Sequence, residues 1–169
     1  MFRTFRGATP AVAANAYIDP SAVLIGDVTV GERSSVWCNV TVRADTSSVR
    51  IGNETNIQDN SCLHEDDDAP LRIGDRVVVG HSCTVHGCDV GDDCLIGMGA
   101  TILSKARIGA GSIVAAGAVV LGGAEVPPRS LVAGIPASVK RPLSDAEVER
   151  IRENAAHYVE LAAQYRGES

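Results

Sequence analysis

The chain has 169 residues, which is enough for one domain with a hydrophobic core and too few to suggest two. Its formal net charge of −6 argues against a nucleic-acid-binding surface, which would need clustered Lys and Arg. No apolar run is long enough to predict a membrane span.

The N-terminal segment MFRTFRGATPAVAANA lacks the continuous apolar block of a signal peptide, because Gly7 and Pro10 interrupt it. The chain has five cysteines, an odd number without CxxC spacing, and this fits reduced thiols better than a disulfide framework. These two observations predict a cytoplasmic protein, and the charge and the lack of a long apolar run predict that it contacts neither nucleic acid nor a membrane.

Aliphatic residues recur at steps of six, often with glycine directly after them, as in VGERSS and IGAGSI. An amphipathic helix has a period of about 3.6 residues and a strand a period of about 2, so neither favours this spacing. A hexad suits a coil of short strands joined by tight turns, in which one aliphatic side chain per strand stacks in the interior. The pattern predicts a mainly β protein over residues 1–142. Two uninterrupted runs carry the repeat: Ile18, Leu24, Val30, Val36 and Val42, then Val90, Ile96, Ile102, Ile108, Val114, Val120, Val126 and Val132.

Between the two runs the repeat continues with two insertions and one deletion. The segment SSV supplies the first insertion, and the acidic segment EDDDAP supplies the second, which we expect to be a solvated loop. From Val85 to Val90 the step is five residues, so one residue is missing at a turn. Three hexads make one coil, which gives the coil three faces.

A helix is predicted for the C-terminal segment, residues 143–169. Ser144 is its expected N-cap, and Glu147 three residues later completes a capping box. An apolar stripe at helical spacing predicts that the helix packs along the outside of the coil or against a neighbouring subunit. The stripe consists of Val148, Ile151, Ala155, Tyr158, Ala162 and Tyr165.

Three of the four histidines fall at related positions of the repeat. His64 and His86 each directly follow an aliphatic residue of the same face, one coil apart, at the roughly 4.8 Å spacing of adjacent strands, so they can bind one metal ion. Arg43 lies one coil further along the same ladder. His81 belongs to another face, where it stacks with Asp59, and about 16 Å of extended chain separates it from His86. We therefore expect His81 to complete a site only in a homo-oligomer, on a neighbouring subunit.

Cys83 and Cys88 alternate with these histidines in the stretch GHSCTVHGC. Cysteine is common as a small buried residue, so we interpret both as core residues rather than ligands. His157 on the terminal helix is interpreted as a surface residue.

The chain resembles the gamma-class carbonic anhydrase-like proteins of the hexapeptide-repeat superfamily. The resemblance runs from about Ile18 to Pro142 and includes a similar helical tail. It is carried by the segments VRAD, NIQDN, CLH, GHSCTVHGC, IGMGA and AGIPA.

The resemblance implies a left-handed parallel β-helix and a homotrimer with metal sites shared between subunits. Each site would be formed by His64 and His86 of one subunit and His81 of another, with Zn²⁺ as the expected ion and Fe²⁺ or Co²⁺ as alternatives. The implied reaction is the reversible hydration of CO₂ to bicarbonate by hydroxide on the metal.

The same resemblance implies roles for further residues. Gln58 would orient the hydroxide or the substrate, and Arg43 with Asp45 would form an inter-subunit pair that organises the site. Asp59 would steady a neighbouring arginine or a ligand. Tyr158 resembles a tyrosine that the terminal helix brings to the pocket in some members, although its spacing alone predicts a place in the apolar stripe.

Two departures from the best-known members bear on proton transfer. Thr46 follows Asp45 where those members carry a glutamate, and the acidic loop from Glu65 to Asp68 is short. Two alternatives to carbonic anhydrase activity therefore stay open. One is an acyl-CoA transferase or thioesterase of the same superfamily, which uses a single histidine as general base. The other is a non-catalytic trimer that the metal holds together.

Overall fold

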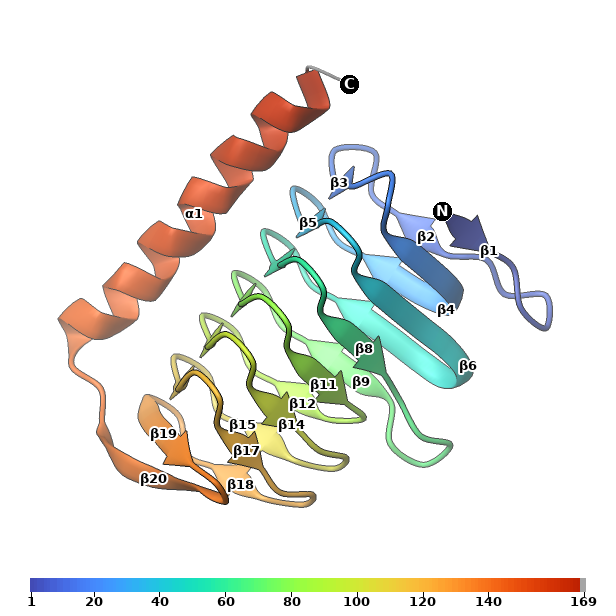
Figure 1. Ribbon diagram of the computed structural model, residues 1–169. Helices are drawn as coiled ribbons and strands as arrows, with labels where there is room; N and C mark the ends of the chain where they lie inside the picture. The colour runs from blue at the N-terminus through green and yellow to red at the C-terminus, as the bar shows by residue number, and fades with distance from the viewer. Residues whose placement is uncertain (168–169) are drawn as a thin grey trace.

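The computed structural model describes residues 1–167, which form a β-helix of short parallel strands with one long helix along its side (Figure 1). The predicted mainly β architecture with a C-terminal helix is confirmed. No helix in the described part of the chain is long and apolar enough to cross a membrane.

The strands stack into three faces. On face one lie β1 (Phe2–Arg3), β8 (Cys62–His64), β11 (Thr84–His86), β14 (Thr101–Ile102) and β17 (Val119–Val120). On face two lie β2 (Ala11–Val12), β9 (Leu71–Ile73), β12 (Asp89–Val90), β15 (Arg107–Ile108) and β18 (Glu125–Val126), and the long strands β4 (Val23–Val30) and β6 (Thr41–Ile51) run through faces one and two. Face three holds β3 (Tyr17–Ile18), β5 (Ser35–Val36), β7 (Asn56–Ile57), β10 (Val78–Val79), β13 (Leu95–Ile96), β16 (Ile113–Val114) and β19 (Ser130–Gly134), with β20 (Ala137–Pro142) antiparallel at its end.

The strand register agrees with the predicted hexads. Val42 pairs with Leu63, and Leu63 pairs with Val85, so these residues share face one as expected. The missing residue after Val85 is absorbed in a tight turn at Gly87, which has a positive φ of 49°, and Val90 returns to the register of Ile73. The deletion therefore shortens one turn without shifting any face.

The stacked aliphatic residues of the repeat form the core of the β-helix. Most of them are fully buried, and almost all belong to one continuous cluster that runs along the axis. Burial of each Val, Leu or Ile side chain contributes about 1.5–3 kcal/mol before the conformational entropy of folding is counted. Aromatic residues are not needed in this narrow interior, because one aliphatic side chain per strand fills it.

Helix α1 (Asp145–Gly167) begins as predicted. The Glu147 carboxylate accepts hydrogen bonds from the backbone N–H and hydroxyl of Ser144, and the N–H of Glu147 donates to Ser144 Oγ, which is the expected capping box. The predicted helical segment extends to Ser169, but residues 168 and 169 lie outside the described part. The separation of residues 1–142 and 143–169 as two units stays a prediction.

The helix packs on face three of its own chain, where it contacts β3, β5, β7 and β10. Val148, Ile151, Ala155 and Ala162 of the apolar stripe are buried, as expected. The two tyrosines of the stripe differ from this pattern: Tyr158 is partly buried, and Tyr165 is 47% exposed with its ring against Trp37.

A buried carboxylate fastens the helix to the β-helix. Asp93, in the turn between β12 and β13, accepts hydrogen bonds from Arg76 Nε at 2.6 Å and from Arg152 Nη2 of α1 at 3.2 Å. Burial disfavours the ionised form of Asp93, but the hydrogen bonds from Arg76 and Arg152 outweigh it and hold the pKa of this carboxyl below its usual value.

We expect Asp93→Asn to lower the free energy of unfolding by about 1–2 kcal/mol at pH 7, because it weakens two charge-assisted bonds to partly exposed arginines. Asn tolerates the left-handed backbone at this position (φ 56°), so the backbone conformation is preserved. A carboxyl with a lowered folded-state pKa stabilises the protein above its unfolded pKa of about 4, and this stabilisation disappears as the pH falls. The difference in melting temperature between the wild type and Asp93→Asn should therefore be largest near neutral pH and should disappear below about pH 4. A difference that does not depend on pH would contradict the ion-pair interpretation.

Candidate metal centre

His64 and His86 lie side by side on face one. They end strands β8 and β11 and occupy paired positions of adjacent coils, as the register predicted. The Nδ1 atom of His64 lies 3.0 Å from the Nε2 atom of His86. Their side chains are 18% and 28% exposed, so the pair lies at the surface of the coil and is accessible from outside.

Each imidazole of the pair uses its other ring nitrogen to contact a polar group. His64 Nε2 lies 3.1 Å from Asp45 Oδ1, and His86 Nδ1 lies 2.9 Å from Ser104 Oγ. The Ser104 hydroxyl donates its proton to Asp66 Oδ2, so its oxygen is left to accept from His86. This hydrogen-bond network assigns the N–H groups to His64 Nε2 and His86 Nδ1.

The two nitrogens that face one another therefore both present lone pairs. Two facing nitrogen lone pairs at 3.0 Å are held together when one cation, a proton or a metal ion, lies between them. Two imidazole nitrogens that bind one tetrahedral ion at about 2.0–2.1 Å are themselves about 3.3 Å apart, which is close to the observed separation. The donor set of His64 and His86 thus fits a divalent metal ion.

His81 lies apart from this pair, after β10, in the turn that leads to β11. Its Nδ1 atom is 3.0 Å from Asp59 Oδ2, so the ladder contact between these residues that the repeat predicted is present. The carboxylate holds one ring nitrogen and leaves Nε2 for another ligand, the arrangement that metal-binding histidines favour. Within the described part of one chain, His81 does not share a group of three ligand atoms within 4.8 Å of one another with His64 and His86.

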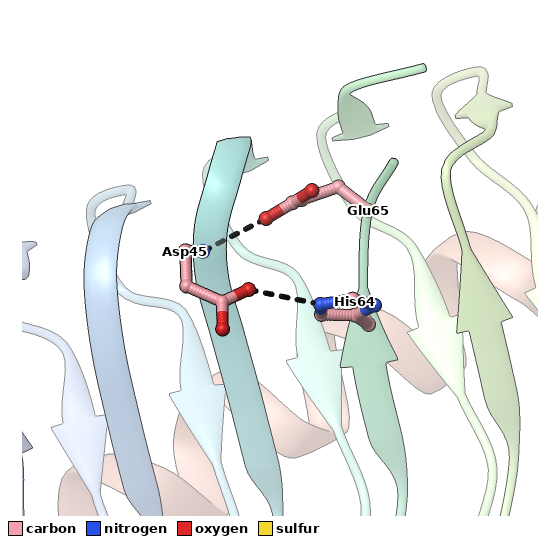
Figure 2. Close-up of side chains that lie close together, drawn as sticks. All are labelled: Asp45, His64 and Glu65. Carbon is pink, nitrogen blue, oxygen red and sulfur yellow. Dashed lines mark hydrogen bonds and ion pairs between the residues drawn. The ribbon is translucent and has the colours of Figure 1, made fainter. Parts of the chain in front are cut away.

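Asp45, His64 and Glu65 form the one such cluster in the described part of the chain (Figure 2). Both oxygens of Glu65 are occupied: Oε1 accepts from the backbone N–H groups of Asp45 and Thr46, and Oε2 accepts from the Thr46 hydroxyl. A fully buried carboxylate with these partners is a poor metal ligand. We interpret the cluster as the support that orients His64.

The expectation of a solvated acidic loop is wrong for Glu65. Asp67 and Asp68 are exposed, but Glu65 is fully buried. Burial disfavours its ionised form, yet the hydrogen bonds from Thr46 and Ser47 outweigh this and lower the pKa of the Glu65 carboxyl. The composition of the segment suggested solvation, whereas the hydrogen-bond donors that bury its first residue come from another strand.

Arg43 and Asp45 form an ion pair within the chain, and the pair between subunits that the resemblance implied stays a prediction. Arg43 Nη1 donates to Asp45 Oδ2 at 2.6 Å, while Asp45 Oδ1 faces His64. The Arg43 guanidinium, followed by His64, holds the pKa of the Asp45 carboxyl below its usual value. Asp45 is therefore an ionised acceptor for the His64 N–H.

Gln58 and Tyr158 line a groove of about 370 Å³ between face three and helix α1. Gln58 is almost fully buried, and its Nε2 donates to Asn56 Oδ1 at 3.1 Å. Burial, followed by the charge of Asp59, raises the pKa of Tyr158. The tyrosine of the apolar stripe thus lies within the electrostatic influence of Asp59 and also lines the groove.

The remaining candidates lie where the sequence predicted. Cys83 and Cys88 are buried in the core cluster, and all five cysteines are free. His157 is exposed on α1.

Ser104 is the partner that sequence reasoning missed. By the hexad register, Leu103 and not Ser104 corresponds to His86, because each follows its inward aliphatic residue directly. The coil that contains His86 is one residue shorter at this turn than the next coil, since Val85 to Val90 is five residues and Ile102 to Ile108 is six. We attribute the contact between Ser104 and His86 to this difference in turn length.

We expect Ser104→Ala to weaken metal binding about tenfold, because it removes the acceptor that fixes the His86 tautomer. Titration of the metal-free protein with Zn²⁺ against a chromophoric chelator measures this affinity. Ser138→Ala, which removes a surface hydroxyl bonded to Lys140, is the matched control and should bind metal like the wild type. Equal affinities for the two variants would contradict the assigned tautomer.

Comparison with known proteins identifies the family of this chain. The family model described as bacterial transferase hexapeptide (six repeats) matches residues 87–122. The chain is 46% identical over 151 residues to a Methanocaldococcus jannaschii protein named "Probable carbonic anhydrase", covering 89% of this chain and 95% of that protein. It is 43% identical over 166 residues to a Geobacillus kaustophilus protein named "Carbonic anhydrase", covering 98% and 91% of the two chains. A solved structure of a hexapeptide transferase family protein from Anaplasma phagocytophilum superposes with a TM-score of 0.94 at 34% identity, covering 97% of each chain. The chain therefore belongs to the gamma-class carbonic anhydrase-like proteins of the hexapeptide-repeat superfamily.

Proposed function

We propose that this chain is the subunit of a metal-dependent carbonic anhydrase that hydrates CO₂ reversibly to bicarbonate. The observation that carries the proposal is the pair of imidazole lone pairs of His64 and His86, which face each other at 3.0 Å with both outer N–H groups held by other side chains. The names of the Methanocaldococcus and Geobacillus relatives support the reaction.

His81 is the proposed third ligand, contributed by a neighbouring subunit of a homotrimer. The chemistry of the faces supports this assembly, because outward residues on face two are largely charged and helix α1 covers face three. One of the two outward ladders of face one carries no charge, and its members Cys62 and Thr84 are exposed. This ladder consists of Val23, Thr41, Cys62, Thr84, Thr101 and Val119.

Zn²⁺ is the expected ion because three imidazoles with an open fourth position are typical of catalytic zinc, and Fe²⁺ and Co²⁺ are the alternatives. When bound, such an ion lowers the pKa of a water molecule towards about 7 and so provides a nucleophile for CO₂ at neutral pH.

The protein's own groups would hold the ligands and the substrate. Asp45, held by Arg43, keeps the proton of His64 on Nε2, and Asp59 keeps that of His81 on Nδ1. Gln58 is restrained by its bond to Asn56 and lines the groove, where it would orient a small polar substrate. Tyr158 would narrow the same groove from the helix side.

We expect the zinc-, iron- or cobalt-loaded protein to hydrate CO₂ in a stopped-flow indicator assay, and His64→Ala to lose both the metal and the activity. Removal of the metal by a chelator should abolish the activity, and readdition should restore it. Acyl-CoA turnover that survives chelation would favour the transferase alternative. Trimers that fall apart on chelation without either activity would favour a metal that only stabilises the assembly.

The shared site makes a quantitative prediction for mixed trimers. The variants His64→Ala and His81→Ala should each lack metal, because each removes a ligand from every site. When equal amounts are dissociated and reassembled together, a mixed trimer regains one complete site of three. Random mixing should therefore restore about one quarter of the wild-type metal per subunit. No restoration, with both variants trimeric, would contradict a site formed between subunits.

A further inference from the structure

Glu65 is an unusual residue for its position. It directly follows His64 and opens an acidic segment, yet its side chain is fully buried. Burial of a carboxylate is costly unless hydrogen bonds replace its water shell. The contacts of Glu65 therefore indicate what the residue does.

The side chain of Glu65 accepts hydrogen bonds from two adjacent residues of strand β6, Asp45 and Thr46. Its Oε1 atom accepts from the backbone N–H of Asp45 at 2.8 Å and of Thr46 at 3.0 Å, and Oε2 accepts from the Thr46 hydroxyl. These residues lie in β6 between its pairing with β8 and its pairing with β9, where the strand passes from face one to face two. The Glu65 carboxylate therefore holds the backbone at a bend where Asp45 and Thr46 have no partner in a neighbouring strand.

The side chain of Asp45 leaves this same fixed backbone. Its Oδ1 atom lies 3.1 Å from His64 Nε2, and its Oδ2 atom accepts from Arg43. Figure 2 shows the two contacts together: the Glu65 carboxylate accepts from the backbone N–H of Asp45, and the Asp45 carboxylate contacts the imidazole of His64. A change in the backbone at Asp45 would redirect its carboxylate and release the N–H of His64.

We propose that Glu65 is a positioning residue for the metal-binding face of His64, an inference that rests on the proposed metal site. Glu65 holds the Asp45–Thr46 backbone, Asp45 holds the N–H of His64, and Nδ1 of His64 is left facing His86. Glu65 itself touches neither the substrate nor the metal.

Two substitutions separate hydrogen bonding from charge and from bulk. Glu65→Gln keeps a carbonyl oxygen for the two backbone N–H groups, and its amide N–H can donate to the Thr46 hydroxyl. Glu65→Met keeps the length of the side chain and removes every acceptor. Asp93→Asn is the matched control, because it alters a buried carboxylate that holds Arg76 and Arg152 instead of a histidine partner.

Three measurements on the full-length protein report the effect: Zn²⁺ affinity by chelator competition, the visible absorption of bound Co²⁺, and the melting temperature of the metal-free form. We expect Glu65→Met to bind Zn²⁺ about 10–100-fold more weakly and to change the Co²⁺ spectrum. Glu65→Gln should stay within about threefold of the wild type, since it restores the acceptor. Asp93→Asn should lower the melting temperature and leave Zn²⁺ affinity and the Co²⁺ spectrum unchanged.

A Glu65→Met protein with wild-type Zn²⁺ affinity and Co²⁺ spectrum would overturn the inference. If Glu65→Met does not fold, Thr46→Val tests the inference instead, because it removes the hydroxyl that donates to Glu65. Weaker metal binding by Thr46→Val would support the positioning role of Glu65, and unchanged binding would refute it. A wild-type protein that binds no metal ion would instead refute the proposed function, so the two failures are distinguishable.

Discussion

The parallel hydrogen-bond ladder between successive coils is the constraint on which the rest of the molecule depends. It holds equivalent positions of adjacent coils at roughly 4.8 Å, and the buried aliphatic residues of each face stack at this spacing. The same ladder brings His64 beside His86 and Asp59 beside His81, although about twenty residues separate the members of each pair in the chain. Core packing and site geometry therefore have one common origin.

The ladder brings the imidazoles together but does not choose which of their nitrogens face each other. That choice is made by acceptors in the turns and bends: Asp45 for His64, Ser104 for His86 and Asp59 for His81. Asp45 lies where an insertion interrupts the repeat, whereas Ser104 and Asp59 lie in turns between strands. The turns and the bend thus carry the chemistry, and the regular strands provide the rigid frame on which the chemistry depends.

Much of this could be predicted from residues alone. The six-residue spacing predicted the three faces through both insertions and the deletion at Val85, because a stacked core leaves an aliphatic residue at every inward position. The capping box at Ser144 was predicted correctly, since its geometry is local in sequence. Handedness is not contained in the hexads, which fit a right-handed coil equally well, and it was implied only by the family resemblance.

The amino-acid sequence by itself determined the register, the shared face of His64 and His86, and the separate face of His81, because these depend only on counting residues along a periodic chain. Tertiary structure alone decided that Glu65 is buried, that Ser104 reaches His86, and that Arg43 binds Asp45 of its own chain. The contacts of Glu65 and Ser104 join an insertion or a turn to a neighbouring coil, and the contact of Arg43 depends on a long flexible side chain. Periodicity assigns no position to such groups, so their partners are set by the path that each turn takes in three dimensions.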